Sequence, residues 1–173
     1  MITIQKVLVA TDFSPVAETA LIYGRALART FDAQLHLVHV VDDFSRFNYA
    51  EGAGLLPPTA FREEIARTGR EKLEATLGED DRRELRAVAV LREGHSTAKE
   101  IADYARETAI DIIVVGATGR GALDRMLMGS VADKVIRQAP CPVLTVRHPE
   151  HEFVMPDALQ RASQAAGTGV LSR

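Results

Sequence analysis

Residues 110–116 are Ile-Asp-Ile-Ile-Val-Val-Gly, and this stretch decides which fold class the sequence favours. Apart from Asp111, every residue from Ile110 to Val115 is Ile or Val. A strand that is apolar on both faces is typical of the centre of a parallel sheet, where helices cover both sides. Gly116 ends the run. The stretch therefore predicts a central parallel strand and an α/β fold.

The N-terminal part of the chain shows the alternation that such a fold needs. Short apolar runs at residues 6–10 and 35–41 predict the first two strands. Between them, Ser14 and Pro15 suit the N-cap and the first position of a helix. Apolar residues then recur at three-and-four spacing as far as Phe31, which predicts an amphipathic helix.

The middle of the chain contains a long loop, a second helix and a third strand. Residues 42–58 hold two prolines and two glycines, which favours a loop. Apolar spacing over residues 61–77 predicts a helix, although Gly69 weakens it. We expect a solvated connection at residues 79–83 and the third strand at residues 85–91, with Gly94 breaking the pattern.

Two further helices flank the central strand. Thr97 and Glu100 form a capping-box pattern before the first of them. Ser130 and Asp133 form a similar cap pattern before a short helix that ends at Gln138. The fifth strand is expected at residues 142–146, with Pro142 as its first residue and Val146 as its last. Alternating strands and helices predict a single-domain α/β/α sandwich of three layers around a parallel sheet.

Composition and charge exclude several function classes. The chain has 173 residues, of which 46% are hydrophobic and 26% charged, with a net charge of −3, as in a soluble globular protein. No basic block or long apolar stretch is present, so we expect neither nucleic-acid binding nor membrane insertion. A single cysteine and the absence of a signal-peptide pattern favour a cytoplasmic location.

Histidine and cysteine do not form a metal or redox pattern. His36 and His39 are three positions apart on one expected strand, so their side chains point to opposite faces. All five histidines are expected to be structural or exposed. Cys141 is followed by a proline at a strand start, and we expect it to be packed rather than reactive.

The residues with the clearest functional pattern are glycines at strand and helix ends. Gly116 and Gly119 follow the central strand, and Gly129 precedes the next helix. Glycine lets a ligand approach bare backbone N–H groups, and a helix N-terminus favours an anion. Ser130 could add a hydroxyl and Arg120 a positive charge to a phosphate site. From the residues alone, the alternative is equally open that Gly116 only ends a strand and Ser130 only caps a helix.

The spacing of these residues is that of a known family. Gly116-x2-Gly119-x9-Gly129-Ser130 matches the pattern G-x2-G-x9-G-[ST], and the chain resembles the ATP-binding universal stress proteins. The resemblance runs from Lys6 to about residue 147 and includes several segments in the same order. They are Val-Ala-Thr-Asp-Phe-Ser at 9–14, Leu-Val-His-Val at 37–40, Asp-Ile-Ile-Val-Val-Gly at 111–116, Gly-Ser-Val at 129–131 and Cys-Pro-Val-Leu-Thr-Val at 141–146.

The resemblance implies a fold and a ligand. The sheet would have five strands in the order 3-2-1-4-5, as in the adenine nucleotide alpha hydrolase-like fold. ATP would lie between the ends of strands 1 and 4, accompanied by Mg²⁺ at its phosphates. The residues carried over as nucleotide-binding are Ala10, Thr11, Asp12, Val40, Gly116, Gly119, Arg120, Gly129, Ser130 and Val131.

These residues divide by the part of the nucleotide that each would meet. Asp12 and the backbone around it would line the ribose and adenine, and Val40 would pair with adenine through its main chain. The first two glycines and Arg120 would hold ribose and phosphates, and the segment from Gly129 to Val131 would cradle the phosphate tail. Thr118 departs from the family, which often has a longer polar or basic residue there, so that contact is not carried over.

For function, the resemblance and the absence of a catalytic motif favour regulation over turnover. The chain lacks a G-x4-GK[ST] loop and the signature of a protein kinase. We therefore expect a nucleotide-dependent regulator of a stress response or of a partner protein, and no catalytic residue or protein metal ligand. The alternatives are a slow ATPase or autophosphorylating enzyme, which would rely on Asp12 and Ser130, and an adapter that binds no nucleotide.

The resemblance also bears on assembly and domain limits. Universal stress proteins pair through the fifth strand, which implies a homodimer through Pro142 to Val146. An exposed apolar sheet edge favours the same conclusion. We expect one domain over residues 1–147 and a C-terminal tail over residues 148–173 that is partly mobile or forms a short helix.

Overall fold

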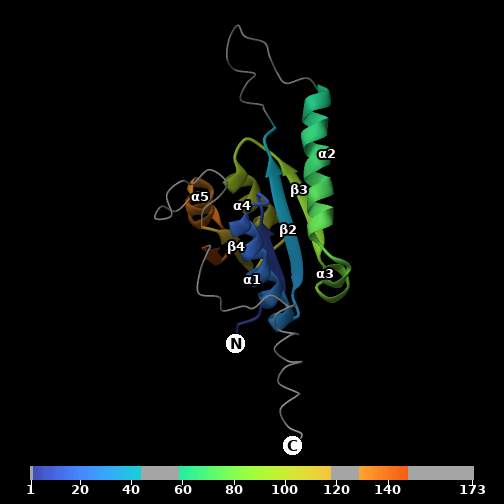
Figure 1. Cartoon of the computed structure of the whole chain (residues 1–173). Helices are drawn as coiled ribbons and strands as arrows, with labels where there is room; N and C mark the ends of the chain where they lie inside the picture. Colours follow the sequence, from blue (N-terminus) through green and yellow to red (C-terminus); the bar gives the residue numbers. More distant parts are fainter. Residues whose placement is uncertain (1, 44–58, 118–128, 148–173) are drawn as a thin grey trace, which may run out of the picture.

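A single parallel sheet organises the chain. The computed structural model describes residues 2–43, 59–117 and 129–147. Within them five strands pair in the order β3-β2-β1-β4-β5, every pair parallel, which confirms the expected fold and strand order. The strands are β1 (Lys6–Ala10), β2 (Gln34–Val41), β3 (Val88–Glu93), β4 (Ile112–Gly116) and β5 (Val143–Val146). Figure 1 shows the sheet with helices on both sides.

Helices cover the two faces of the sheet and form a core on each. The helices are α1 (Pro15–Phe31), α2 (Thr59–Thr76), α3 (Glu79–Glu84), α4 (Thr97–Glu107) and α5 (Ser130–Gln138). On one face, α1 and α2 pack against the inward side chains of Val7, Val9 and Leu37. On the other, α4 and α5 pack against Leu8, Val38 and Ile113. Successive strand residues thus serve opposite cores, which is why β4, and β1 after Lys6, are apolar.

The first helix starts where the sequence predicts it. Ser14 Oγ accepts a hydrogen bond from Ala17 N at 3.3 Å, and Pro15 is the first helical residue. Gly24 explains how closely this helix approaches the sheet, because a Cβ atom there would lie 2.2 Å from Cγ2 of Val9. Only glycine leaves room at this crossing.

Gly69 has a comparable explanation. The helix α2 runs through it without interruption and buries it against the sheet. A Cβ atom at Gly69 would lie 3.0 Å from Cδ1 of Leu91 and 3.4 Å from Cδ2 of His39. The residue that weakens the helix in isolation therefore allows α2 to lie close to β2 and β3.

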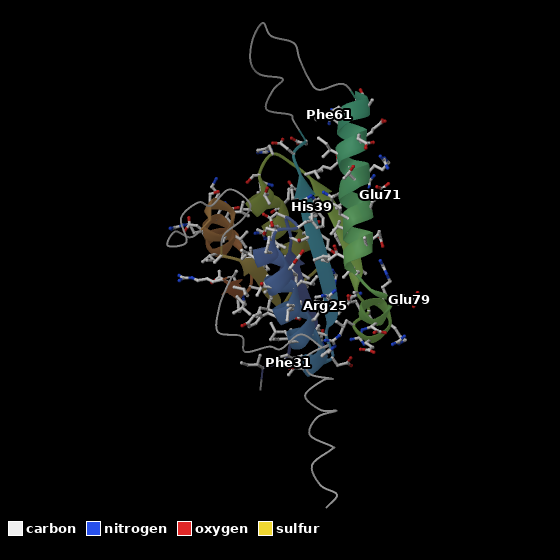
Figure 2. The ribbon with its side chains drawn as sticks, in the orientation of Figure 1. Arg25, Phe31, His39, Phe61, Glu71 and Glu79 are labelled. Carbon is white, nitrogen blue, oxygen red and sulfur yellow. The ribbon has the colours of Figure 1, made fainter. Side chains whose placement is uncertain are left out.

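The segment before β3 differs from the prediction. Residues 79–83 belong to helix α3 rather than to a solvated connection, because Asp81 is buried and fixes the segment to α1. Its carboxylate accepts hydrogen bonds from Arg25 Nε at 2.8 Å and Arg25 Nη2 at 2.6 Å, and also from Gly78 N at 3.1 Å. Leu85 ends α3 instead of starting a strand, so β3 begins three positions later at Val88 than predicted. Figure 2 shows Arg25 near the lower end of the sheet, on the side of α3.

Two predicted helix caps are also wrong in detail. Ser96 is the N-cap of α4, and Thr97 is its first helical residue. The side chain of Glu100 does not complete a capping box but pairs with Arg92 Nη2 at 3.2 Å. At α5 the N-cap is Gly129, so Ser130 is the first helical residue rather than the cap.

The predicted opposite orientation of His36 and His39 and the predicted packing of Cys141 agree with the described structure. His36 Nδ1 lies 2.8 Å from Tyr104 Oη of α4, and His39 Nδ1 lies 2.8 Å from the Thr11 carbonyl oxygen, so the two rings serve opposite faces. Burial lowers the pKa of His36 to about 4, with a smaller contribution from Lys6. Cys141 packs against the α4 and α5 core, and burial raises the pKa of its thiol.

Candidate functional site

The direction in which successive strands are added to the sheet reverses at β1, in the centre of the sheet. β1 has β2 on one side and β4 on the other, and the later strands are added outward from each. In open parallel sheets, ligands bind beyond the carboxyl ends of the strands at such a reversal point. The residues that follow β1 and β4, and those opposite them on β2 and α5, are therefore the candidates for function.

Val40 offers main-chain groups to this region. Val38 accepts a hydrogen bond from Thr11 N at 2.9 Å, so its main chain faces β1. Main-chain groups along a strand alternate between its two neighbours, so those of Val40 face the same side as those of Val38. The last residue of β1, Ala10, pairs with Val38. The main chain of Val40 thus faces the space beyond the end of β1.

Gly116 lies opposite, on the other side of the same end of β1. The last pair between β1 and β4 joins Ala10 to Val115, and Gly116 is the next residue along β4. It pairs on its outer side with Val146 of β5. Gly116 and Val40 therefore flank the end of the central strand from its two neighbours.

The start of α5 is fixed to the end of β4. Gly129 N donates a hydrogen bond of 2.6 Å to the carbonyl oxygen of Ala117, the residue that follows Gly116. Ser130 and Val131 then form the first turn of α5 and are both exposed. The first N–H groups of a helix have no partner within it and carry a partial positive charge, which suits an anion. The structure thus brings two of the three predicted glycines to one place.

The acidic residue in this first turn is neutralised locally. Asp133 pairs with Arg137 one turn later, with Nε 3.1 Å from Oδ2. A side-chain hydrogen bond from Arg137 holds the pKa of Asp133 below its usual value. The carboxylate therefore brings little net negative charge to the start of α5.

The turn after β1 is ordered by its own side chains. Thr11 Oγ1 accepts a hydrogen bond from Phe13 N, and Asp12 Oδ1 accepts one from Ser14 N, both at 3.0 Å. Thr11 and Asp12 are half-buried. Turns closed by Thr and Asp side chains of this kind fix a short loop without regular structure. Asp12 is thereby held at the carboxyl end of β1, where the sequence places a ligand contact.

Two residues at this turn were not singled out for the site from the sequence. Phe13 has a left-handed backbone with φ of 61°, and its ring centroid lies 4.5 Å from that of His39. Figure 2 shows His39 near the upper, carboxyl end of β2. Both residues lie in segments of the family resemblance, at 9–14 and 37–40, but no pattern in the sequence pairs them.

Several expectations fall outside the described residues. Gly119 and Arg120 are among them, as are most of the loop at residues 42–58 and the tail at residues 148–173. Among the residues that the structure describes, no group of three or more His, Cys, Asp or Glu side chains is placed to hold a metal ion. In the same part of the chain, none of the helices has both the length and the apolar character needed to cross a bilayer.

Comparison with known proteins points to one family. The family model described as "Universal stress protein family" matches residues 3–147. A universal stress protein of Methanocaldococcus jannaschii is 34% identical over 149 residues, which cover 86% of this chain and 85% of the relative.

Solved structures resemble the chain in sequence and fold. A protein of the universal stress protein family from Burkholderia pseudomallei is 30% identical, with a TM-score of 0.62 over 82% of this chain and 94% of that one. A universal stress protein from Archaeoglobus fulgidus, solved in complex with dAMP, is 26% identical, with a TM-score of 0.54 over 84% of this chain and 99% of that one.

Proposed function

Because the chain belongs to the universal stress protein family, we propose that it binds an adenine nucleotide at the carboxyl ends of β1 and β4. We propose ATP as that nucleotide and a regulatory role, in which occupancy of the site changes how the protein acts on a partner in a stress response. The similar Archaeoglobus protein in complex with dAMP supports the choice of an adenine nucleotide.

One observation carries the proposal. The main chain of Val40 and the end of β4 at Gly116 flank the carboxyl end of β1, and the exposed first turn of α5 starts beside the end of β4. A purine ring can hydrogen-bond to the main chain of a strand, and a phosphate can bind the N–H groups at a helix start. These groups suit the two ends of a nucleotide.

Each site residue then has a role in the proposal. Thr11 and Asp12, with the main chain at Ala10, contact the ribose and adenine, and Val40 pairs with adenine. Gly116 leaves room for the ribose. The segment from Gly129 through Ser130 to Val131 holds the phosphates. Gly119 and Arg120, outside the described residues, complete the phosphate site.

Mg²⁺ in this proposal is held mainly by the nucleotide and by water. Among the described residues there is no cluster of three metal-ligating side chains, and Asp12 is the carboxylate in the turn after β1. Mg²⁺ commonly keeps several waters and takes one or two carboxylates with substrate phosphates. The donor set at this edge fits an ion that arrives with ATP, neutralising its phosphates.

Calorimetry tests the proposal. The protein is titrated with ATP and with AMP in the presence of Mg²⁺, and saturable binding of ATP is expected. Ser130→Ala should weaken ATP about three- to tenfold through loss of one hydrogen bond, and should weaken AMP less. Ser96→Ala is the matched control, because Ser96 stands at the N-cap of α4, outside the proposed site. Absence of binding at millimolar ATP contradicts the proposal and favours an adapter that binds no nucleotide.

Turnover is proposed to be little or none. The Asp12 carboxylate accepts a hydrogen bond within its own turn from Ser14 N, which suits a ligand contact or a turn former better than a general base. Single-turnover incubation with labelled ATP should therefore give neither free phosphate nor labelled protein. Release of phosphate would instead support the slow ATPase.

We also propose a homodimer through β5. This strand is at the edge of the sheet, so one row of its main-chain groups faces away from β4. Val131 and Ile136 of α5, which packs beside β5, are exposed apolar residues at 38% and 43% of their surface. A second copy that pairs along residues 142–146 would cover this edge.

A further inference from the structure

The turn between β1 and α1 adopts a costly backbone conformation. Phe13 has φ of 61°, in the left-handed region that favours glycine. For a bulky residue this is an outlier, and such conformations persist only where the surroundings enforce them. The turn carries Thr11 and Asp12, so whatever enforces its shape also sets their position.

His39 of β2 contacts this turn in two ways. Its Nδ1 lies 2.8 Å from the carbonyl oxygen of Thr11. A carbonyl oxygen can only accept, so His39 donates this hydrogen bond. The ring of His39 also packs on the ring of Phe13, with centroids 4.5 Å apart and planes tilted by 50°. One side chain therefore holds both the backbone before Asp12 and the ring after it.

The ring of His39 is itself confined by helix α2. Its Cδ2 would lie 3.4 Å from a Cβ atom at Gly69, so the absence of a side chain there lets the helix rest on the ring. Lys72, one turn further along α2, places Nζ 5.8 Å from the centroid of the Phe13 ring. The turn, β2 and α2 thus form one packed unit around His39.

We infer that His39, together with Phe13, is a positioning residue that holds the Thr11–Asp12 turn ready for the nucleoside part of the nucleotide. The inference rests on the proposed function. Preorganisation of this kind raises affinity because a ligand need not order the loop when it binds. Since the turn would meet the ribose and adenine, the benefit should be equal for AMP and ATP.

Variants at His39 test the inference. His39→Leu removes the donor to Thr11 and should weaken AMP and ATP by the same factor, about tenfold, as expected for loss of an ordering contact. His39→Asn restores an N–H donor on a short side chain and should recover most of the affinity. His36→Leu is the matched control on the opposite face of the same strand and should leave both affinities unchanged.

A second readout is independent of nucleotide. In the protein without ligand, hydrogen exchange at Phe13 N, which donates to Thr11 Oγ1, should be faster in His39→Leu than in the unaltered chain and normal in His39→Asn. If His39→Leu does not fold, Phe13→Gly replaces it, because glycine tolerates the backbone while removing the ring, and its affinities should fall likewise.

The outcomes separate the inference from its premise. If the unaltered protein binds nucleotide and neither His39→Leu nor Phe13→Gly binds more weakly, the inference is wrong and the proposed function stands. If His39→Asn binds as weakly as His39→Leu, the hydrogen bond to Thr11 is not the cause, and the inference is also wrong. If the unaltered protein binds neither nucleotide, the proposed function fails and the inference fails with it.

Discussion

At the scale of single residues, the close approach of α1 to the sheet depends on Gly24. A Cβ atom there would lie 2.2 Å from Cγ2 of Val9, a fully buried side chain. Gly24→Ala should therefore lower the free energy of unfolding by about 1–3 kcal/mol, as overpacking of a core does. Urea denaturation measures the change.

The control is Gly78→Ala, where a Cβ atom would meet only Asp81 Oδ2 at 3.9 Å. Gly78→Ala should lower the free energy of unfolding by no more than about 1 kcal/mol, as expected for a change from glycine to alanine at an N-cap. If both variants lose the same free energy of unfolding, α1 can move away from β1 without additional cost, which would contradict the account of Gly24.

The buried His36 predicts how stability depends on pH. Burial lowers its pKa in the folded protein from 6.5 to about 4. Between these two pH values the unfolded chain binds the proton and the folded chain does not, so the stability present above pH 6.5 is lost as the pH falls toward 4. His36→Gln lacks this titration. Between pH 7 and pH 4.5 the unaltered protein should lose about 2 kcal/mol more unfolding free energy than the variant. Parallel pH profiles would contradict the assignment.

Residues near the site differ in how far the sequence could predict them. Gly116 and Gly129 could be placed together, because the carboxyl end of a strand and the start of the helix that follows it lie at the same end of a parallel sheet. The pairing of Phe13 with His39 could not, because the ring separation depends on how β1, β2 and α2 pack. The role of Ser130 as N-cap was wrong by one position, since Gly129 makes the hydrogen bond that fixes the start of α5.

At the scale of elements, a buried ion pair joins the short helix α3 to α1. The Asp81 side chain is 6% exposed and pairs with Arg25 of α1, which is 25% exposed. Asp81→Asn leaves Arg25 without its carboxylate and should cost about 2–4 kcal/mol of unfolding free energy. Asp80→Asn in the same helix is the control, because its partner Arg83 is 68% exposed and the pair lies in solvent. That change should cost less than about 1 kcal/mol. Similar losses in the two variants would contradict a special role for Asp81.

The edge strand β5 carries the prediction about assembly. The carbonyl oxygens of Pro142 and Val146 accept hydrogen bonds from Ile113 and Ala117, so the even-numbered residues face β4. The main chain of Thr145 therefore faces outward. Thr145→Pro removes an outward amide without touching the pairs with β4, and edge positions tolerate proline.

Light scattering should show a monomer for Thr145→Pro and a dimer for the unaltered chain. Thr145→Ala keeps the amide and should remain a dimer, which separates loss of the amide from loss of the side chain. A dimer that persists in Thr145→Pro would place the interface elsewhere.

The elements themselves were predictable to different degrees. β1, α1 and the centre of β4 follow from apolar runs and caps that need no distant contact. The start of β3 did not, because Leu85 is apolar and buried but belongs to the end of α3. Burial alone cannot tell a strand from a helix end. The structure shows a helix end, because Leu85 N donates a hydrogen bond to the Asp81 carbonyl oxygen and the Asp81 side chain pairs with Arg25 of α1.

At the scale of the whole molecule, the two ends of the parallel strands differ in the groups that lie there. At the amino ends of the strands, the backbone is held by hydrogen bonds within the fold: Asp111 Oδ2 accepts one from Gln5 N at 2.7 Å and one from Lys6 N at 2.9 Å. At the carboxyl ends of the strands lie the turn after β1, the last residues of β2 and the exposed start of α5. This asymmetry is the physical basis for proposing a nucleotide site at the carboxyl ends of the strands.

The measurement that tests this placement most directly is an NMR titration of the uniformly labelled protein with ATP and Mg²⁺. The account predicts saturable shifts of the backbone amides of Thr11, Val40, Gly116 and Ser130, with Lys6 and Asp111 at the amino ends of the strands unchanged. Shifts confined to the amino ends, or no shifts at saturating ATP, would contradict it.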